Sequence, residues 1–367
     1  MTLLLTGGAG LLGLHLVREN LLAGRHVTVL AQDDARATYQ RIEQFLVASG
    51  AGDRLPARPR DLLAVVPVDL THHSLGLSPT QERRLAGQAT ALWRAGTPVL
   101  PGGRSIPVRH TTISGTENLL RFAALMHPSA PLRHVSTVFV AGRYRAATFR
   151  EQHSAEVVDF ESPEERAEHT AEGLVRRWAN RHGRAALILR PGILVPGPAT
   201  AGFAEHPLGV LARTIATVAA QAPARSSRVV LRIRSEPRSF LNLLQADRAA
   251  RAALRLGERV TDLGTRTVHV VHPADTPVRA VARAIEDVLP VRLRMTPYKP
   301  AELTRAERAF HERGGAFLPY LTQRRRFDGT ALRGHGVELA PPPIEREYLA
   351  EVLGAELSTR DEGLAAA

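Results

Sequence analysis

Short apolar runs alternate with amphipathic segments through the first 200 residues of the chain. Runs bounded by turn residues are typical of buried strands, whereas apolar residues three and four positions apart are typical of helices. The predicted strands are Thr2–Thr6, His26–Ala31, Leu63–Leu70, Ala89–Ala95, Leu132–Val140 and Ala185–Val195. The predicted helices are 11–23, 36–48, 115–126 and 164–181. Strands that alternate with helices in this way predict an α/β fold around a parallel, doubly wound sheet.

The turn between the first predicted strand and the first helix is rich in glycine. Gly7, Gly10 and Gly13 let the backbone turn tightly, let a pyrophosphate approach and let the helix pack on the strand. The N–H groups at the helix start, from Leu11 and Leu12, would then face the phosphates. Strand, loop, helix and strand follow one another within about 30 residues, which predicts a Rossmann-type dinucleotide site. The alternative is a glycine-rich turn that binds no ligand.

The pattern changes after Gly197. Residues 201–260 are mostly helical in pattern, apart from an apolar run at Val229–Ile233, and 276–367 combine helices with loops. Between them, 268–272 is predicted to be a strand that returns to the main sheet. We therefore expect a dinucleotide-binding domain at 1–200, and at 201–367 a smaller, mostly helical region that binds or covers the substrate.

Polar residues after the second and third predicted strands indicate how the chain could distinguish NAD from NADP. Asp33 and Asp34 lie about 20 residues beyond the glycine loop, where an acidic residue holds the ribose hydroxyls of NAD. Arg36 could instead bind the 2′-phosphate of NADP, and Asp69 would contact the adenine. Each of these charges could also be an ordinary solvated loop charge.

Composition narrows the function classes. The net charge is +12, but the arginines are spread along the chain, and Lys299 is the only lysine among 48 basic residues. This spread indicates codon bias rather than a nucleic-acid surface. Cysteine is absent and the histidines lack metal-ligand spacing, so no metal site is predicted. No apolar stretch of about 18 residues occurs and the first strand starts at Thr2, so a cytoplasmic enzyme without a membrane span is expected.

Several motifs resemble those of the extended short-chain dehydrogenase/reductase superfamily, nearest its thioester-reductase and fatty-acyl-reductase branch, which is also called male-sterility-like. The matching segments are Thr6–Gly13, Val68-Asp69-Leu70, Gly115-Thr116, His134-Val135-Ser136-Thr137, Ala171–Arg176, Arg190-Pro191-Gly192 and Phe327-Asp328. The resemblance implies a nicotinamide cofactor, NADP or NAD with NADP favoured. It also implies a small carbonyl substrate or an acyl group on CoA or a carrier protein, with no nucleic acid or membrane as partner.

The resemblance breaks at the positions that carry the chemistry. The tyrosine and lysine of the family's Tyr-x-x-x-Lys pair correspond to Glu164 and Glu168. Other family residues are also replaced: a histidine at the end of the fourth strand by Arg94, an asparagine by Thr112 and a phosphate-binding arginine by Gln32. The hydroxyl position is kept, in Ser136 and Thr137.

Glu164 and Glu168 are one helical turn apart, so two carboxylates could share a face and divide into an acid and a base. The alternative is a helix start, with Ser162 as N-cap and Glu165 closing a capping box.

A strand-end hydroxyl, Thr137 or Ser136, would bind a substrate carbonyl, or would only bond the local backbone. Arg94 would pair with a phosphate, a carboxylate or Glu164, or would lie on the surface.

Two enzyme functions remain open from the sequence. The first is an atypical NAD(P)H-dependent reductase of a carbonyl or acyl thioester in specialised metabolism. The second is a non-redox enzyme on the same scaffold, such as a Dieckmann-type cyclase, a dehydratase or an isomerase. A protein that senses NAD(P) without turnover is a further alternative.

Overall fold

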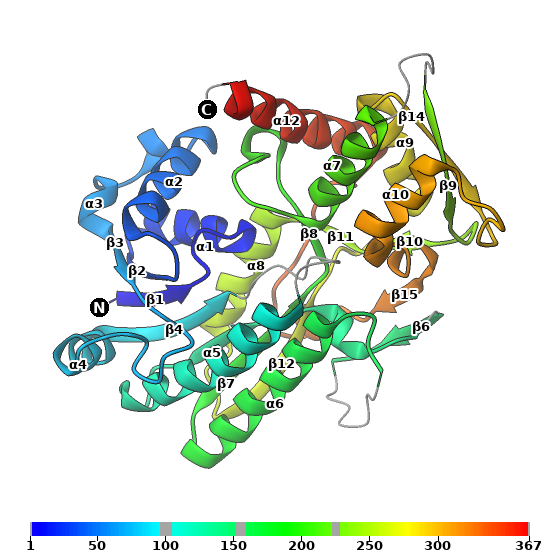
Figure 1. Cartoon of the computed structure of the whole chain (residues 1–367). Helices are drawn as coiled ribbons and strands as arrows, with labels where there is room; N and C mark the ends of the chain where they lie inside the picture. Colours follow the sequence, from blue (N-terminus) through cyan, green and yellow to red (C-terminus); the bar gives the residue numbers. More distant parts are fainter. Residues whose placement is uncertain (1, 96–104, 145, 152–158, 222–227, 366–367) are drawn as a thin grey trace.

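Seven parallel strands form the central sheet of the computed structural model (Figure 1), which describes residues 2–95, 105–144, 146–151, 159–221 and 228–365, with the backbone alone for 105–110 and 359–365. Their order is β12-β7-β5-β4-β1-β2-β3. The strands are β1 (Thr2–Thr6), β2 (His26–Ala31), β3 (Leu63–Pro67), β4 (Ala89–Ala95), β5 (Leu132–Val135), β7 (Ala185–Pro191) and β12 (Gly264–Val270). The chain runs outward from β1 to β3 and then outward again from β4, so the predicted doubly wound α/β fold is confirmed. Ligands of such sheets bind where the strand order reverses, between β1 and β4.

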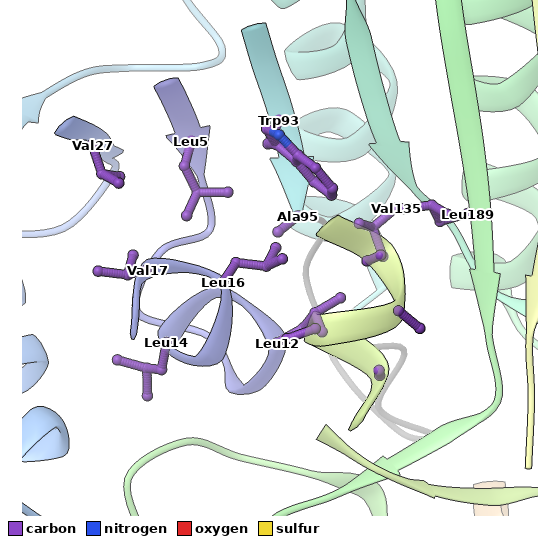
Figure 2. Close-up of a cluster of buried hydrophobic side chains, with 14 of the residues drawn as sticks. Leu5, Leu12, Leu14, Leu16, Val17, Val27, Trp93, Ala95, Val135 and Leu189 are labelled. Atoms are coloured by element: carbon purple, nitrogen blue, oxygen red, sulfur yellow. The ribbon is translucent and has the colours of Figure 1, made fainter. Parts of the chain in front are cut away.

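Helices cover both faces of this sheet. One layer holds α1 (Leu11–Leu22), α2 (Ala35–Ala48) and α8 (Ala246–Arg259). The other holds α4 (Pro79–Gln88), α5 (Ser105–Leu125) and α6 (Pro163–His182). Figure 2 shows Leu12 and Leu16 projecting from α1 toward the strand that ends at Ala95, within one buried apolar cluster. This packing fixes the start of α1 close to the carboxyl ends of the strands.

Three predicted strands are shorter in the structure. The expected run to Leu70 stops at Pro67, because the Asp69 amide turns to the carbonyl of Leu75. The run to Val140 becomes β5 followed by a 3₁₀ turn at Val138–Ala141. The run to Val195 breaks at Gly192 into β7 and β8 (Ile193–Val195). Val68, Leu70, Val138, Val140 and Val195 are apolar and buried although they lie beyond these strand ends, so apolarity alone could not mark where the strands end.

The second half has its own apolar core. Its helices are α7 (Pro207–Ala220), α9 (Val278–Val288), α10 (Arg305–Gly314), α11 (Thr330–Gly334) and α12 (Arg346–Ala365). Short strand pairs complete it: β9 (Val229–Arg234) with β14 (Val291–Thr296), β10 (Phe240–Leu241) with β13 (Thr276–Pro277), β11 (Leu243–Gln245) with β8, and β15 (Arg324–Phe327) with β6 (Ala146–Phe149). A short helix, α3 (Pro59–Leu62), precedes β3.

The chain returns to the main sheet as expected, since β12 pairs in parallel with β7 along its whole length. It returns at 264–270 rather than 268–272, because the polar start Gly264–Thr267 also pairs. Residues 1–200 and 201–367 therefore share one sheet, and the division into two domains stays a prediction.

Candidate active site

The glycine loop is shaped by contacts with its own backbone. Gly7 has a positive φ of 69°, and a Cβ there would lie 1.9 Å from the carbonyl oxygen of Ala95. A Cβ on Gly13 would lie 2.0 Å from the Gly7 carbonyl oxygen. Gly10 differs, because its Cβ would meet only the Gly7 oxygen, at 3.3 Å, and its φ of −78° suits any residue. Gly7 and Gly13 are thus required by the fold, whereas Gly10 leaves its outer side open.

The start of α1 carries no side-chain cap. Gly10 is its N-cap residue, no side chain in the described part of the chain caps the first-turn amides, and the first turn has no acidic residue. The amides of Leu11, Leu12 and Gly13 therefore have no partner from a capping side chain, and the helix dipole adds positive potential there. This arrangement fits an anionic pyrophosphate.

A pocket opens from this loop toward the second half of the chain. It holds about 1070 Å³ of empty space, part of it open to solvent, and most of its lining is apolar. Its polar lining residues are Ser136, Thr137, Glu168, Glu205, His206 and Tyr320. The far wall comes from the C-terminal half, with Leu208 and Leu211 of α7 and Phe317, Tyr320 and Leu321. Both halves of the chain therefore build one cavity.

Residues expected at the adenosine end lie at the ends of β2 and β3, outside this pocket. Gln32 and Asp33 are exposed, and Arg36 is exposed in the first turn of α2. Asp34 caps α2 by accepting from the Ala37 amide at 2.7 Å.

The third strand supplies the last two expected contacts. Asp69 is exposed, and its Oδ1 accepts from the hydroxyl and the amide of Thr71, which lowers the pKa of Asp69. The buried Leu70 offers its carbonyl to Asn118 at 2.8 Å, so it fixes the chain beside Asp69. These residues follow β2 and β3, where the sequence predicts that an adenosine would bind.

Arg94 and Glu168 form a buried ion pair at the pocket wall. Arg94, near the end of β4, donates two hydrogen bonds to the Glu168 carboxylate on α6, at 3.1 and 3.2 Å. The side chains are 7% and 5% exposed, and Nε2 of the fully buried His134 lies 3.4 Å from Glu168. Burial opposes ionisation, but Arg94 and His134 outweigh it and lower the pKa of Glu168. Burial and then Arg94 lower the pKa of His134. The pair places a carboxylate, held ionised by Arg94, on the pocket wall.

Glu164 lies one turn before Glu168, buried in the first turn of α6. It is not among the residues that line the pocket. Its Oε1 has no hydrogen-bond partner within the part of the chain that the structure describes. The two glutamates predicted to act together are therefore held differently, since within the described residues Glu168 is held in an ion pair and lines the cavity, whereas Glu164 does neither.

Ser136 and Thr137 follow β5 and both line the pocket. Thr137 Oγ1 accepts from the Phe139 amide at 3.3 Å, which leaves its own hydroxyl proton available. Among the described residues the Ser136 hydroxyl has no hydrogen-bond partner of ordinary geometry, although it is close enough to help lower the pKa of Glu172. The strand-end position expected to meet a substrate carbonyl thus faces the cavity.

Glu172 is held by a second buried ion pair, with Arg190 of β7 at 2.7 and 2.8 Å. Burial opposes ionisation of Glu172, but Arg190 prevails and lowers its pKa to about 2. This pair joins α6 to the sheet below the pocket. It fixes the helix that carries Glu168, and its residues do not line the cavity.

Glu165 does not close the capping box expected at the start of α6. Ser162 does accept from the Glu165 amide, at 3.2 Å, but the Glu165 carboxylate accepts from the Glu161 amide at 2.9 Å. Its other oxygen accepts from the hydroxyl of Tyr320 at 2.5 Å. Tertiary contact with the second half of the chain has taken the carboxylate that would otherwise cap the helix.

Sequence reasoning missed Tyr320 and His206 as pocket residues. Tyr320 lies 155 positions after Glu165, and the intervening loops give no signal for their contact. The sequence could have indicated His206 as the N-cap of α7, because Pro207 follows it. In the structure its Nδ1 accepts from the Gly209 amide at 3.3 Å, and its Nε2 lies 3.4 Å from Glu356. Tyr144 is 53% exposed, and its ring lies tilted against that of Phe149.

Residues 5–253 match a family of NAD-binding proteins described as Male sterility protein. The chain belongs to this family. The family lies within the NAD(P)-binding extended short-chain dehydrogenases/reductases, so the resemblance to their thioester-reductase branch is confirmed. No curated protein sequence matches the chain significantly.

Solved structures share the fold of this family member. The terminal R domain from the myxalamid PKS-NRPS biosynthetic pathway has a TM-score of 0.73 at 22% identity, over 99% of this chain and 91% of that one. The reductase (R) domain of a nonribosomal peptide synthetase from Mycobacterium tuberculosis has a TM-score of 0.71 at 20% identity, over 99% and 92%. UDP-glucose-4-epimerase from Stenotrophomonas maltophila, with bound NAD, has 0.67 at 18%, over 100% of both chains.

The described residues lack two other kinds of feature. None of their helices is long and apolar enough to span a membrane. They contain no group of three or more histidine, aspartate or glutamate side chains placed to hold a metal ion. Lys299, the lone lysine, is exposed beyond β14 and does not line the pocket.

Proposed function

We propose that this family member is an atypical NAD(P)H-dependent reductase of a carbonyl group or of an acyl thioester held on CoA or a carrier protein. The observation that carries the proposal is the continuity of the pocket, from the uncapped start of α1 to the apolar wall of the second half. If the pyrophosphate of a dinucleotide binds at the helix start, the rest of the cofactor can extend into the cavity, whose apolar walls suit an acyl chain. The neighbouring R domains of peptide and polyketide synthetases support a thioester substrate.

In this proposal each of several residues has a separate role in binding or positioning. When bound, the nicotinamide cofactor supplies a hydride. Gly10 and the amides of Leu11 and Leu12 hold its phosphates, and the Thr137 hydroxyl orients the substrate carbonyl oxygen. The ionised Glu168 cannot donate a proton, so its pairing with Arg94 gives it a positioning role. The apolar walls exclude water from the reacting carbonyl.

We propose NADPH as the preferred cofactor, with the exposed Arg36 beside the 2′-phosphate. The start of α2 adds positive potential at this point, although Asp33 and the Asp34 cap oppose it. Arg36→Ala should weaken NADPH binding about tenfold, equivalent to about 1.4 kcal/mol, and leave NADH binding unchanged. Calorimetric titration checks this, with Arg41→Ala, an exposed arginine farther along α2, as the control. An equal loss of affinity for NADPH and NADH would show that Arg36 does not bind the 2′-phosphate.

A non-redox reaction such as ring closure or elimination is the second candidate. The observation in its favour is Glu164, a buried carboxylate that stands where the family has its tyrosine and whose Oε1 has no partner among the described residues. Glu168 is a poor base because Arg94 already holds its carboxylate. A base would therefore have to be Glu164. A sensor without turnover would use the same glycine loop and make no product.

One experiment separates these functions. The protein is incubated with acyl-CoA thioesters and aldehydes, with and without NADPH, and both NADPH oxidation and products are followed. We expect aldehyde or alcohol to form only with NADPH, in proportion to its oxidation. In that case Glu164→Gln should retain activity within about twofold, like the exposed control Glu117→Gln. Product without cofactor that is lost in Glu164→Gln would instead establish the non-redox reaction, and no product at all would favour the sensor.

A further inference from the structure

The proposed reductase needs a proton donor, and its family's donor position is Glu164, outside the pocket lining. Glu168 is ionised, and among the described residues the Thr137 hydroxyl is bonded to no acid that could resupply its proton. Among the pocket-lining residues, Tyr320 alone is a phenol. It is 6% exposed, and its ring packs edge-on against Phe139, with centroids 5.1 Å apart. Phe139 follows Thr137 by two residues, so the phenol belongs to the wall that carries the carbonyl-binding hydroxyl.

The hydroxyl of Tyr320 is hydrogen-bonded to the carboxylate of Glu165. It donates to Oε1 of Glu165 at 2.5 Å, a short distance for a hydroxyl bonded to a carboxylate. Glu165 is fully buried, and burial raises its pKa to about 7. Burial and Glu165 also raise the pKa of Tyr320. At neutral pH a large fraction of Glu165 therefore carries a proton, and the phenol keeps its own.

Charged neighbours limit how far Glu165 can be neutralised. Arg325 of β15 is buried, donates to the Tyr144 carbonyl at 2.6 Å and lies near both Glu161 and Glu165. Arg325 favours the ionised form of Glu165, whereas Glu161 favours the protonated form. The Glu161 amide also donates to Glu165 and favours the carboxylate. These opposed effects let the Glu165 carboxyl both take up and release a proton near neutrality.

We propose that Tyr320 replaces the missing family tyrosine as proton donor and that Glu165 resupplies its proton. This rests on the proposed reductase function. Hydride adds to the carbonyl carbon, and the C=O π electrons move to the oxygen. When Glu165 is protonated, its hydrogen bond with Tyr320 reverses, so that Glu165 donates to the phenol oxygen and the phenol O–H is free to face the substrate. The substrate oxygen takes the proton of Tyr320, and the phenol oxygen takes the proton of Glu165. Glu165 is then reprotonated from water, so each turnover uses one hydride from the nicotinamide and one solvent proton. For a thioester the product collapses to an aldehyde and a thiol.

Tyr320→Phe tests the donor. We expect kcat to fall by about 100-fold or more, the usual contribution of a positioned acid, while NADPH affinity stays within about twofold. The matched control is Tyr348→Phe, because Tyr348 of α12 also donates through its hydroxyl, to the Pro196 carbonyl at 2.7 Å, but does not line the pocket. Wild-type kcat in Tyr320→Phe would overturn the proton relay alone. Absence of any NADPH-dependent turnover in the wild type would overturn the reductase function and the relay with it.

Glu165→Gln tests the resupply and remains decisive if Tyr320→Phe fails to fold, because the amide still offers Tyr320 a hydrogen-bond partner. Wild-type kcat should fall as pH rises through about 7, because the protonated form of Glu165 is the active one. In Glu165→Gln this fall should disappear and kcat should be lower throughout. A merely structural contact would lower the unfolding temperature without moving the pH profile, so an unchanged profile would overturn the proposal.

Discussion

Replacing Gly10 by valine is expected to abolish dinucleotide binding and leave the protein folded. The backbone at Gly10 is extended, and the added Cβ meets only the Gly7 carbonyl oxygen, so the loss of stability should be at most about 1 kcal/mol. The valine methyls would occupy the side from which a pyrophosphate approaches. We expect the Kd for NADPH to rise at least about 100-fold, equivalent to about 2.7 kcal/mol. Calorimetry and thermal unfolding measure the two effects separately.

Two further glycines make this experiment specific. Gly13→Val should unfold the protein, because its Cβ would lie 2.0 Å from the Gly7 carbonyl oxygen. Gly87→Val, at an exposed position of α4 with nothing within 4 Å of its Cβ, should change neither property appreciably. Normal binding by Gly10→Val, or no binding of either cofactor by the wild type, would show that the loop is not a nucleotide site.

Breaking the buried pair of Arg94 and Glu168 is expected to cost much more stability than breaking an exposed ion pair. Glu168→Gln leaves a guanidinium buried without its counter-charge, which costs about 3–5 kcal/mol. The double variant Arg94→Met with Glu168→Met removes both charges and should recover most of that loss. Urea unfolding gives the free energies. The exposed pair of Asp287 and Arg346 is the control, and Asp287→Asn should cost at most about 1 kcal/mol. An equal cost at both pairs would contradict the assignment.

The same pair predicts a difference in acid stability. In the folded protein Arg94 and His134 lower the pKa of Glu168, so the unfolded chain takes up a proton at a higher pH than the folded one. The stabilisation is complete above the ordinary glutamate pKa of about 4.3 and is lost as pH falls through the lower folded value. The stability of Glu168→Gln should therefore depend less steeply on pH below about 4.3 than that of the wild type.

Much of the sheet could be predicted because its strands differ sharply from what flanks them. β1, β2 and β4 have the predicted bounds, since polar or glycine residues end each apolar run. β5 could not be bounded, because Val138 and Val140 are as apolar as the strand but belong to a buried 3₁₀ turn.

The site was predictable only in part. Arg94 ends a strand at the carboxyl edge, so a carboxylate partner could be expected, although Glu168 rather than Glu164 supplies it. Tyr320 and Glu165 meet through the packing of two halves of the chain, and nothing in the local pattern of either residue encodes that contact. Local periodicity thus predicts elements, whereas contacts between distant loops need the structure.

The return of the chain at β12 makes the fold a single cooperative unit. β12 completes the sheet beside β7, and α8, which precedes it, packs on α1 through Ala253 and Leu256. A fragment cut after residue 200 would leave the backbone N–H and C=O groups of β7 as an open edge, which invites pairing with other chains. During synthesis the outer edge of β7 stays unpaired until β12, 79 residues later in register (Ala185 with Gly264), has been made, so this edge is where aggregation of the nascent chain would compete with folding.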